Sequence, residues 1–256
     1  MSVDLIRSLD ALKDKLSFIA TGNYHGKIMD IKVKNHPSEE PKNKYPILEG
    51  IYTGIVLGAI GVYAFLKSAS DTTQDMLVTD IKADNGQLSI FGFCLEGKKA
   101  TPSKGDNYHL VIKSPNDNEQ KILNILKRFH IYYQEVSFYN DFPYLKDKNE
   151  NDYYSLLQQA VVWTATDNFP LSEFIARFFH NNIENEMTRD DIINVLMLSL
   201  YILKEADYEI TNFTMYNDVK TVLQIMYLTK SLDKKFIKDL QDKYEIKMLT
   251  YLDVKC

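Results

Sequence analysis

The sequence predicts an α+β protein in which a β-rich N-terminal half with hairpins packs against a helical C-terminal half. Two observations predict this class. Up to residue 113 the apolar residues form short alternating runs separated by turn-forming residues, and after Pro115 they recur at helical spacing. The chain has 256 residues, 45% hydrophobic and 25% charged, so it can bury a sizeable core. We therefore expect one globular domain over residues 1–256.

The first 20 residues have the spacing of an amphipathic helix. The apolar positions that would share one face are Leu5, Leu9, Leu12, Leu16 and Ile19. Asp4, Asp10 and Asp14 interrupt any apolar run, so the segment does not resemble a signal peptide. The N-terminus by itself therefore indicates a cytoplasmic protein.

Residues 26–34 alternate like a half-buried strand, and residues 47–66 allow more than one structure. The sixteen residues from Ile51 to Leu66 carry no charge. This uncharged run is shorter than the roughly 20 residues that a membrane-spanning helix needs. We expect either a buried core helix or a glycine turn followed by the strand "VYAFL". Membrane contact through residues 47–66 is the less favoured alternative.

The clearest local signal is a β-hairpin. Residues 76–83 and 87–95 are strand-like runs joined by Asp84-Asn85-Gly86, and Asn-Gly supplies the positive φ angles of a tight hairpin turn. A further strand is predicted over residues 108–113.

The remaining chain predicts helices. Thr188 followed by Asp191 three residues later has the pattern of an N-terminal cap. The predicted helical segments cover residues 118–133, 156–168, 170–183, 188–206, 217–230 and 231–245.

Composition and motif spacing argue against several functions. The net charge of −5 and the absence of a basic run argue against a nucleic-acid partner and against anionic lipid. The five histidines share no ligand spacing, and no glycine-rich loop has the pattern of a phosphate-binding site. We therefore expect no metal and no cofactor. Of the two cysteines, Cys256 is the last residue and the sequence assigns it no role.

Two residues deserve a chemical interpretation from the sequence alone. Cys94 ends a predicted strand, and His109 lies on the following strand. If a hairpin joined the two strands, Cys94 could act as a nucleophile with His109 as its base. A buried, inert cysteine is the simpler interpretation. Gln159 lies one helical turn before Trp163 and two turns before Asp167. A buried amide without a partner costs roughly 2–7 kcal/mol, so Gln159 needs one.

Three short motifs carry a resemblance to a known family. "FCL" at 93–95, "QAVVW" at 159–163 and "TD" at 166–167 resemble the motifs of the thioester domains of Gram-positive surface adhesins. That family has an aromatic-or-Leu, Cys, apolar motif on a strand and a Gln-x-x-apolar-aromatic motif on a helix. Gln159 fits this pattern with Trp163 in the aromatic position, whereas Gln158 would place Val162 there. The resemblance covers about residues 87–168 and leaves 169–256 unassigned.

The resemblance implies a covalent binding function. Cys94 and Gln159 would be joined, with loss of ammonia, into an internal thioester that captures an amine, most simply a Lys side chain on a protein partner. Phe91, Phe93 and Trp163 would exclude water, and Asp167 or His109 would accept the proton of the amine. The module would react once instead of catalysing turnover, and the resemblance favours the cell surface.

Two alternatives follow from the same residues. One is a non-covalent protein-interaction domain with a structural Cys94. The other is a cysteine hydrolase or transferase that uses Cys94 and a histidine.

Overall fold

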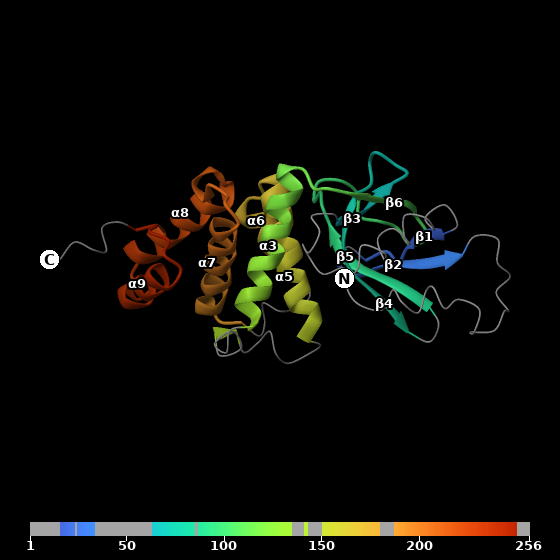
Figure 1. The fold of residues 1–256 in the computed structure, drawn as a ribbon. Coiled ribbons are helices and arrows are strands. Elements are labelled where there is room, and N and C mark those ends of the chain that lie inside the picture. The colour runs from blue at the N-terminus through green and yellow to red at the C-terminus, as the bar shows by residue number, and fades with distance from the viewer. Residues whose placement is uncertain are drawn as a thin grey trace. The chain divides into compact units, whose positions relative to one another are not determined.

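The computed structural model describes residues 16–23, 25–33, 63–84, 87–134, 141–142, 150–179 and 187–249. The chain divides into two compact units, residues 1–120 and 121–256. The first, called the β unit below, is built from strands, and the second, called the helical unit, is built from helices (Figure 1). The fold is therefore α+β, with a β-rich N-terminal half and a helical C-terminal half.

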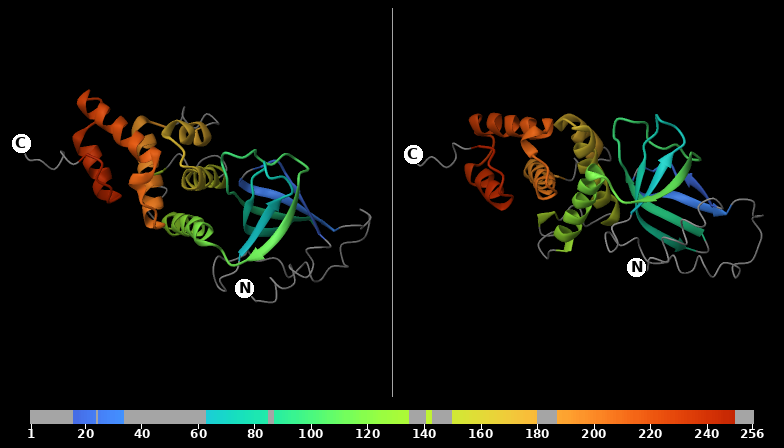
Figure 2. Two further views of the ribbon diagram at one scale, coloured as in Figure 1. Left: turned by 90° about the horizontal axis from the view of Figure 1, so that it is seen from above. Right: turned by 45° about the horizontal axis from the view of Figure 1, so that its top comes forward.

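The β unit is a closed barrel of six antiparallel strands (Figure 2). The strands follow the order β1-β2-β5-β4-β3-β6, and β1 pairs with β6 to close the barrel. Their bounds are β1 Leu16–Ala20, β2 His25–Val33, β3 Tyr63–Ser68, β4 Met76–Asp84, β5 Gln87–Cys94 and β6 Asn107–Lys113.

Period-2 alternation defines the inside of this barrel. Leu110, Leu66, Met76 and Cys94 are cross-strand partners in turn, and all four side chains are buried. The opposite face of β3 and β6 carries the exposed pair Lys67 and His109. The row that contains Cys94 is therefore the inner one.

Gly92 is required where β5 passes close to the backbone of β4. A Cβ atom at this position would lie 2.1 Å from the carbonyl oxygen of Leu77 and 2.7 Å from Cδ1 of Ile28. No larger residue fits without moving the backbone. This close approach holds the backbone of β5 against β4 at a position two residues before Cys94.

The structure confirms the predicted hairpin. β4 and β5 pair with Asp84 opposite Gln87, which leaves two residues for the turn, Asn85 and Gly86, themselves outside the described residues. The strand prediction "VYAFL" is also confirmed by β3, whereas residues 47–62 lie outside the described residues.

The predicted N-terminal helix is wrong where the structure can test it. Leu16 and Ile19 belong to β1, in which Leu16, Phe18 and Ala20 are buried in alternation. Pairing with both β2 and β6 gives this short segment two sets of backbone hydrogen bonds, and this tertiary context overrides its helical spacing. Residues 1–15 lie outside the described residues.

The helical unit contains most of the predicted helices, and the largest shift is at the start of the predicted 156–168 helix, which begins six residues earlier, at Glu150. Its helices are α5 Glu150–Asp167, α6 Leu171–Phe178, α7 Arg189–Glu205, α8 Thr214–Leu228 and α9 Lys234–Lys243, with a short 3-10 helix η4 at Ile210–Asn212. The helix α3, Asp117–Gln134, crosses the boundary between the two units. In the described part of the chain no helix combines the length and the apolar character needed to span a membrane.

The helix α7 begins with the predicted cap. The Thr188 hydroxyl accepts a hydrogen bond from Asp191 N, and the Asp191 carboxylate accepts one from Thr188 N at 2.8 Å. This reciprocal pair satisfies two of the backbone N–H groups that a helix start leaves free.

Thr188→Ala is expected to lower the free energy of unfolding by about 1 kcal/mol, because a helix-start hydroxyl is worth roughly 0.5–2 kcal/mol. Denaturant unfolding followed by circular dichroism measures this loss. Thr221→Ala is the control, since its exposed hydroxyl donates to the Asn217 carbonyl within α8 and caps no helix start. Equal midpoints for the two variants would contradict the expectation.

Candidate functional site

Cys94 is the last residue of β5 and its side chain has no exposed surface. It lies opposite Met76 in the β4–β5 ladder, in the inner row of the barrel. The ladder continues past Cys94, because Leu95 N donates to Asp75 O at 2.9 Å. The cysteine is therefore held by paired strands at the end of an interior layer.

The residues after Cys94 are tied back to the segment that precedes β4. Asp75 N donates to Glu96 Oε2 at 3.1 Å, and Glu96 Oε1 forms an ion pair with Lys99 Nζ at 2.8 Å. Lys67 also pairs with the Asp75 carboxylate. These charged side chains, Lys67, Asp75, Glu96 and Lys99, are called the charged cluster below.

A buried polar network supports the same region. The Tyr108 hydroxyl, from β6, donates to the backbone oxygen of Gln74 at 2.9 Å. The Gln74 side chain is fully buried, and its Nε2 donates to the Lys99 carbonyl at 3.1 Å. Tyr108 and Gln74 thus connect the barrel interior with the segment that follows Cys94.

The environment of Cys94 keeps its thiol protonated. Burial raises the pKa of the Cys94 thiol well above its ordinary range, and the negative charge of Glu96 raises it further. A cysteine nucleophile acts as a thiolate, which needs the opposite shift of the pKa. The β unit thus provides a protected sulfur and not an activated one.

We expect the Cys94 thiol to react slowly with iodoacetamide in the folded protein at every pH from about 7 to about 9. Only the thiolate reacts, so at each pH the rate should be at least about tenfold below that of an accessible thiol of ordinary pKa, about 8.5. The measurement uses a Gln159→Ala chain, and the same chain in denaturant is the reference. A rate in the folded chain close to that in denaturant would contradict the burial argument.

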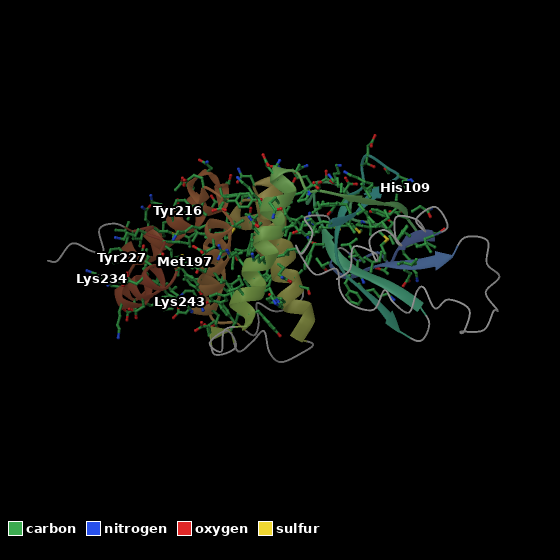
Figure 3. All side chains as sticks on the ribbon, viewed as in Figure 1. His109, Met197, Tyr216, Tyr227, Lys234 and Lys243 are labelled. Atoms are coloured by element: carbon green, nitrogen blue, oxygen red, sulfur yellow. The ribbon has the colours of Figure 1, made fainter. Side chains whose placement is uncertain are left out.

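The structure does not bring His109 to Cys94. In the barrel β6 pairs with β1 and β3, while β5 pairs with β2 and β4, so no hairpin joins the two residues. His109 is exposed between the buried Tyr108 and Leu110, on the outer face of β6 (Figure 3). The hairpin that would have joined His109 to Cys94 does not form, because chain order is not strand order in this barrel.

Phe91 and Phe93 lie on the outer face of β5, opposite the row that contains Cys94. Successive side chains of a strand alternate, so the two rings point away from the row of Cys94. Phe93 is 6% exposed and pairs across the sheet with Leu77. Met76 and Tyr108, not the two phenylalanines, share the inner face with Cys94.

Gln159 lies on α5 and is fully buried, whereas Gln158 is 8% exposed. Trp163, one turn later, is also fully buried. Its ring centroid lies 6.2 Å from that of Phe169 and 5.1 Å from the guanidinium carbon of Arg177 on α6. The helical unit therefore places the candidate amide one turn from a packed aromatic cluster.

Asp167 ends α5 and is not an immediate neighbour of Gln159. Eight residues of helix separate the two positions, which is about 12 Å along the axis. The Asp167 carboxylate accepts a hydrogen bond from the Thr166 hydroxyl at 2.9 Å. The Thr-Asp pair therefore belongs to the end of the helix, followed by Asn168, whose side-chain oxygen accepts from Thr214 N at the start of α8.

The two candidate thioester residues therefore belong to different units. Cys94 belongs to the β unit and Gln159 to the helical unit. Sequence reasoning missed Glu96, Tyr108 and Gln74 near Cys94. Glu96 had a visible signal, a carboxylate two residues after the cysteine, whereas Tyr108 and Gln74 become neighbours only when the barrel closes.

No group of three metal-binding side chains occurs in the part of the chain that the structure describes. Comparison with protein-family models, with curated proteins and with solved structures finds no match to this chain.

Proposed function

We propose that the protein is a covalent binding module in which Cys94 and Gln159 form an internal thioester that captures an amine on a protein partner. One observation carries the proposal: the "FCL" motif falls at the end of a strand and the "QAVVW" motif falls on a helix, and both Cys94 and Gln159 are fully buried. These are the element types that the resemblance to thioester domains of surface adhesins implies.

The chemistry balances without a cofactor. The Cys94 sulfur attacks the side-chain carbonyl carbon of Gln159, and the amide nitrogen leaves as ammonia with the thiol proton. A primary amine then attacks the same carbon, forms an amide with the Gln159 carbonyl and returns a thiol to Cys94. Each molecule reacts once, which makes the protein a capture device and not a turnover enzyme.

Burial supports this use of the two residues. Water hydrolyses a thioester, so a long-lived one requires side chains that solvent does not reach. A thiol of raised pKa is also a poorer leaving group, so the acyl–sulfur bond opens more slowly, which suits a bond that must persist until a partner arrives. A cysteine hydrolase using His109 is less well supported, because β5 and β6 are not neighbours in the barrel.

The test is the intact mass of the purified protein. We expect the wild type to be lighter than its sequence mass by one molecule of ammonia, and to gain the mass of methylamine when treated with it. Cys94→Ala is expected to have its full sequence mass and to gain nothing. A wild-type mass equal to the sequence mass would refute the thioester and leave the non-covalent interaction domain as the better hypothesis.

A further inference from the structure

The charged cluster beside Cys94 already contains a bound ammonium group. Glu96 Oε1 holds Lys99 Nζ at 2.8 Å, and the other carboxylate oxygen accepts the Asp75 backbone N–H. About a third of each side chain of this ion pair is exposed, 33% for Glu96 and 36% for Lys99. An ammonium group from solution can therefore reach the carboxylate and compete with Lys99.

The carboxylate lies at the same end of the barrel as the sulfur. Asp75 comes directly before Met76, the cross-strand partner of Cys94. Because Glu96 Oε2 accepts from Asp75 N, its side chain folds back onto the end of the β4–β5 ladder where Cys94 lies. The contribution of the Glu96 charge to the raised pKa of the Cys94 thiol agrees with this placement.

Amine capture needs a group in this position. Near neutral pH a Lys side chain arrives as an ammonium ion, which has no lone pair and cannot attack a carbonyl carbon. A carboxylate can bind the ammonium and accept its proton as the nitrogen attacks the carbonyl carbon.

We propose that Glu96 is the amine-binding residue of the capture reaction: it exchanges Lys99 for the ammonium of the arriving amine and accepts its proton. This inference rests on the proposed thioester. The nitrogen loses two protons in all, one through Glu96 to solvent and one to the Cys94 sulfur as the carbon–sulfur bond breaks. The site then selects cationic amines, such as a Lys side chain, over neutral nucleophiles.

The experiment compares the rates at which two small nucleophiles open the thioester, measured by intact mass near neutral pH. Methylamine is cationic under these conditions and hydroxylamine is neutral. Glu96→Gln removes the charge and keeps an oxygen that can accept from Asp75 N. We expect this variant to react with methylamine at least about tenfold more slowly than the wild type, and with hydroxylamine at an unchanged rate.

The chain offers a closely matched control in Glu119. Its Oε2 accepts the Asn116 backbone N–H at 2.9 Å, and its Oε1 holds Lys113 Nζ at 2.7 Å, the same pattern as at Glu96. Lys113 and Tyr108 are five residues apart on β6, about 17 Å along the strand, so this pair sits far from the Cys94 end. Glu119→Gln is expected to leave both rates unchanged.

Lys99→Gln tests the exchange step. Removing the resident ammonium is expected to raise the methylamine rate about two- to fivefold, the factor that corresponds to an exposed ion pair. Equal methylamine rates in Glu96→Gln and Glu119→Gln, or equal slowing of both nucleophiles in Glu96→Gln, would overturn the role of Glu96 while the thioester stands. A wild type without the ammonia deficit would refute the thioester itself, and this inference with it.

Discussion

Gln159→Ala is expected to abolish both the ammonia deficit and the uptake of methylamine, because it removes the carbonyl carbon that forms the thioester. The effect should be all or none, since an alanine side chain has no carbonyl carbon. Intact mass before and after methylamine treatment measures it.

Gln158→Ala is the matched control for this experiment. The two residues have the same side chain, are adjacent on α5 and differ in burial, 8% exposed for Gln158 and 0% for Gln159. Both substitutions insert a strong helix former. Gln158→Ala should keep the deficit, and loss of the deficit in Gln158→Ala but not in Gln159→Ala would show that the register derived from Trp163 is wrong.

Trp163→Ala is expected to lower the free energy of unfolding of the helical unit by about 3–5 kcal/mol, the usual cost of truncating a fully buried large aromatic side chain. The variant loses packing against Phe169 and the stacking surface beneath Arg177. Denaturant unfolding followed by far-ultraviolet circular dichroism gives the change, because the variant has no tryptophan left to report on the transition.

Two further variants separate packing from charge in this cluster. Trp163→Phe keeps a ring and should cost clearly less than the alanine variant. Arg177→Gln keeps both rings and removes the cation that lies over Trp163 and Phe169, together with its ion pair to Glu173; the cation over the ring is worth about 0.5–1 kcal/mol at a partly exposed site. A loss below about 1 kcal/mol in Trp163→Ala would mean that the cluster collapses around the cavity, and would contradict the tight packing on which the expectation depends.

The sequence predicted most of the elements because their signals are local. The Asp84-Asn85-Gly86 turn fixed the β4–β5 hairpin, and Thr188 with Asp191 fixed the start of α7. The segment Leu16–Ala20 was the exception, since its residues fit either period and only pairing with β2 and β6 decides between them.

The surroundings of Cys94 were less predictable for a topological reason. Placing His109 next to Cys94 assumed that consecutive strands are neighbours, but the barrel inserts other strands between β5 and β6. Phe91 and Phe93 were assigned by closeness in sequence, although alternation turns them to the opposite face. Asp167 shares a helix with Gln159, yet two turns of rise separate them.

Closure of the barrel has a consequence for crowding. An open sheet ends in strands whose unpaired N–H and C=O groups can recruit strands of another molecule. Each of the six described strands has a partner on both sides, although β3 with β4 and β1 with β6 pair over only two residue pairs each. Recruitment of another molecule's strand is therefore not expected at β5, which pairs with β2 and β4 along nearly its whole length.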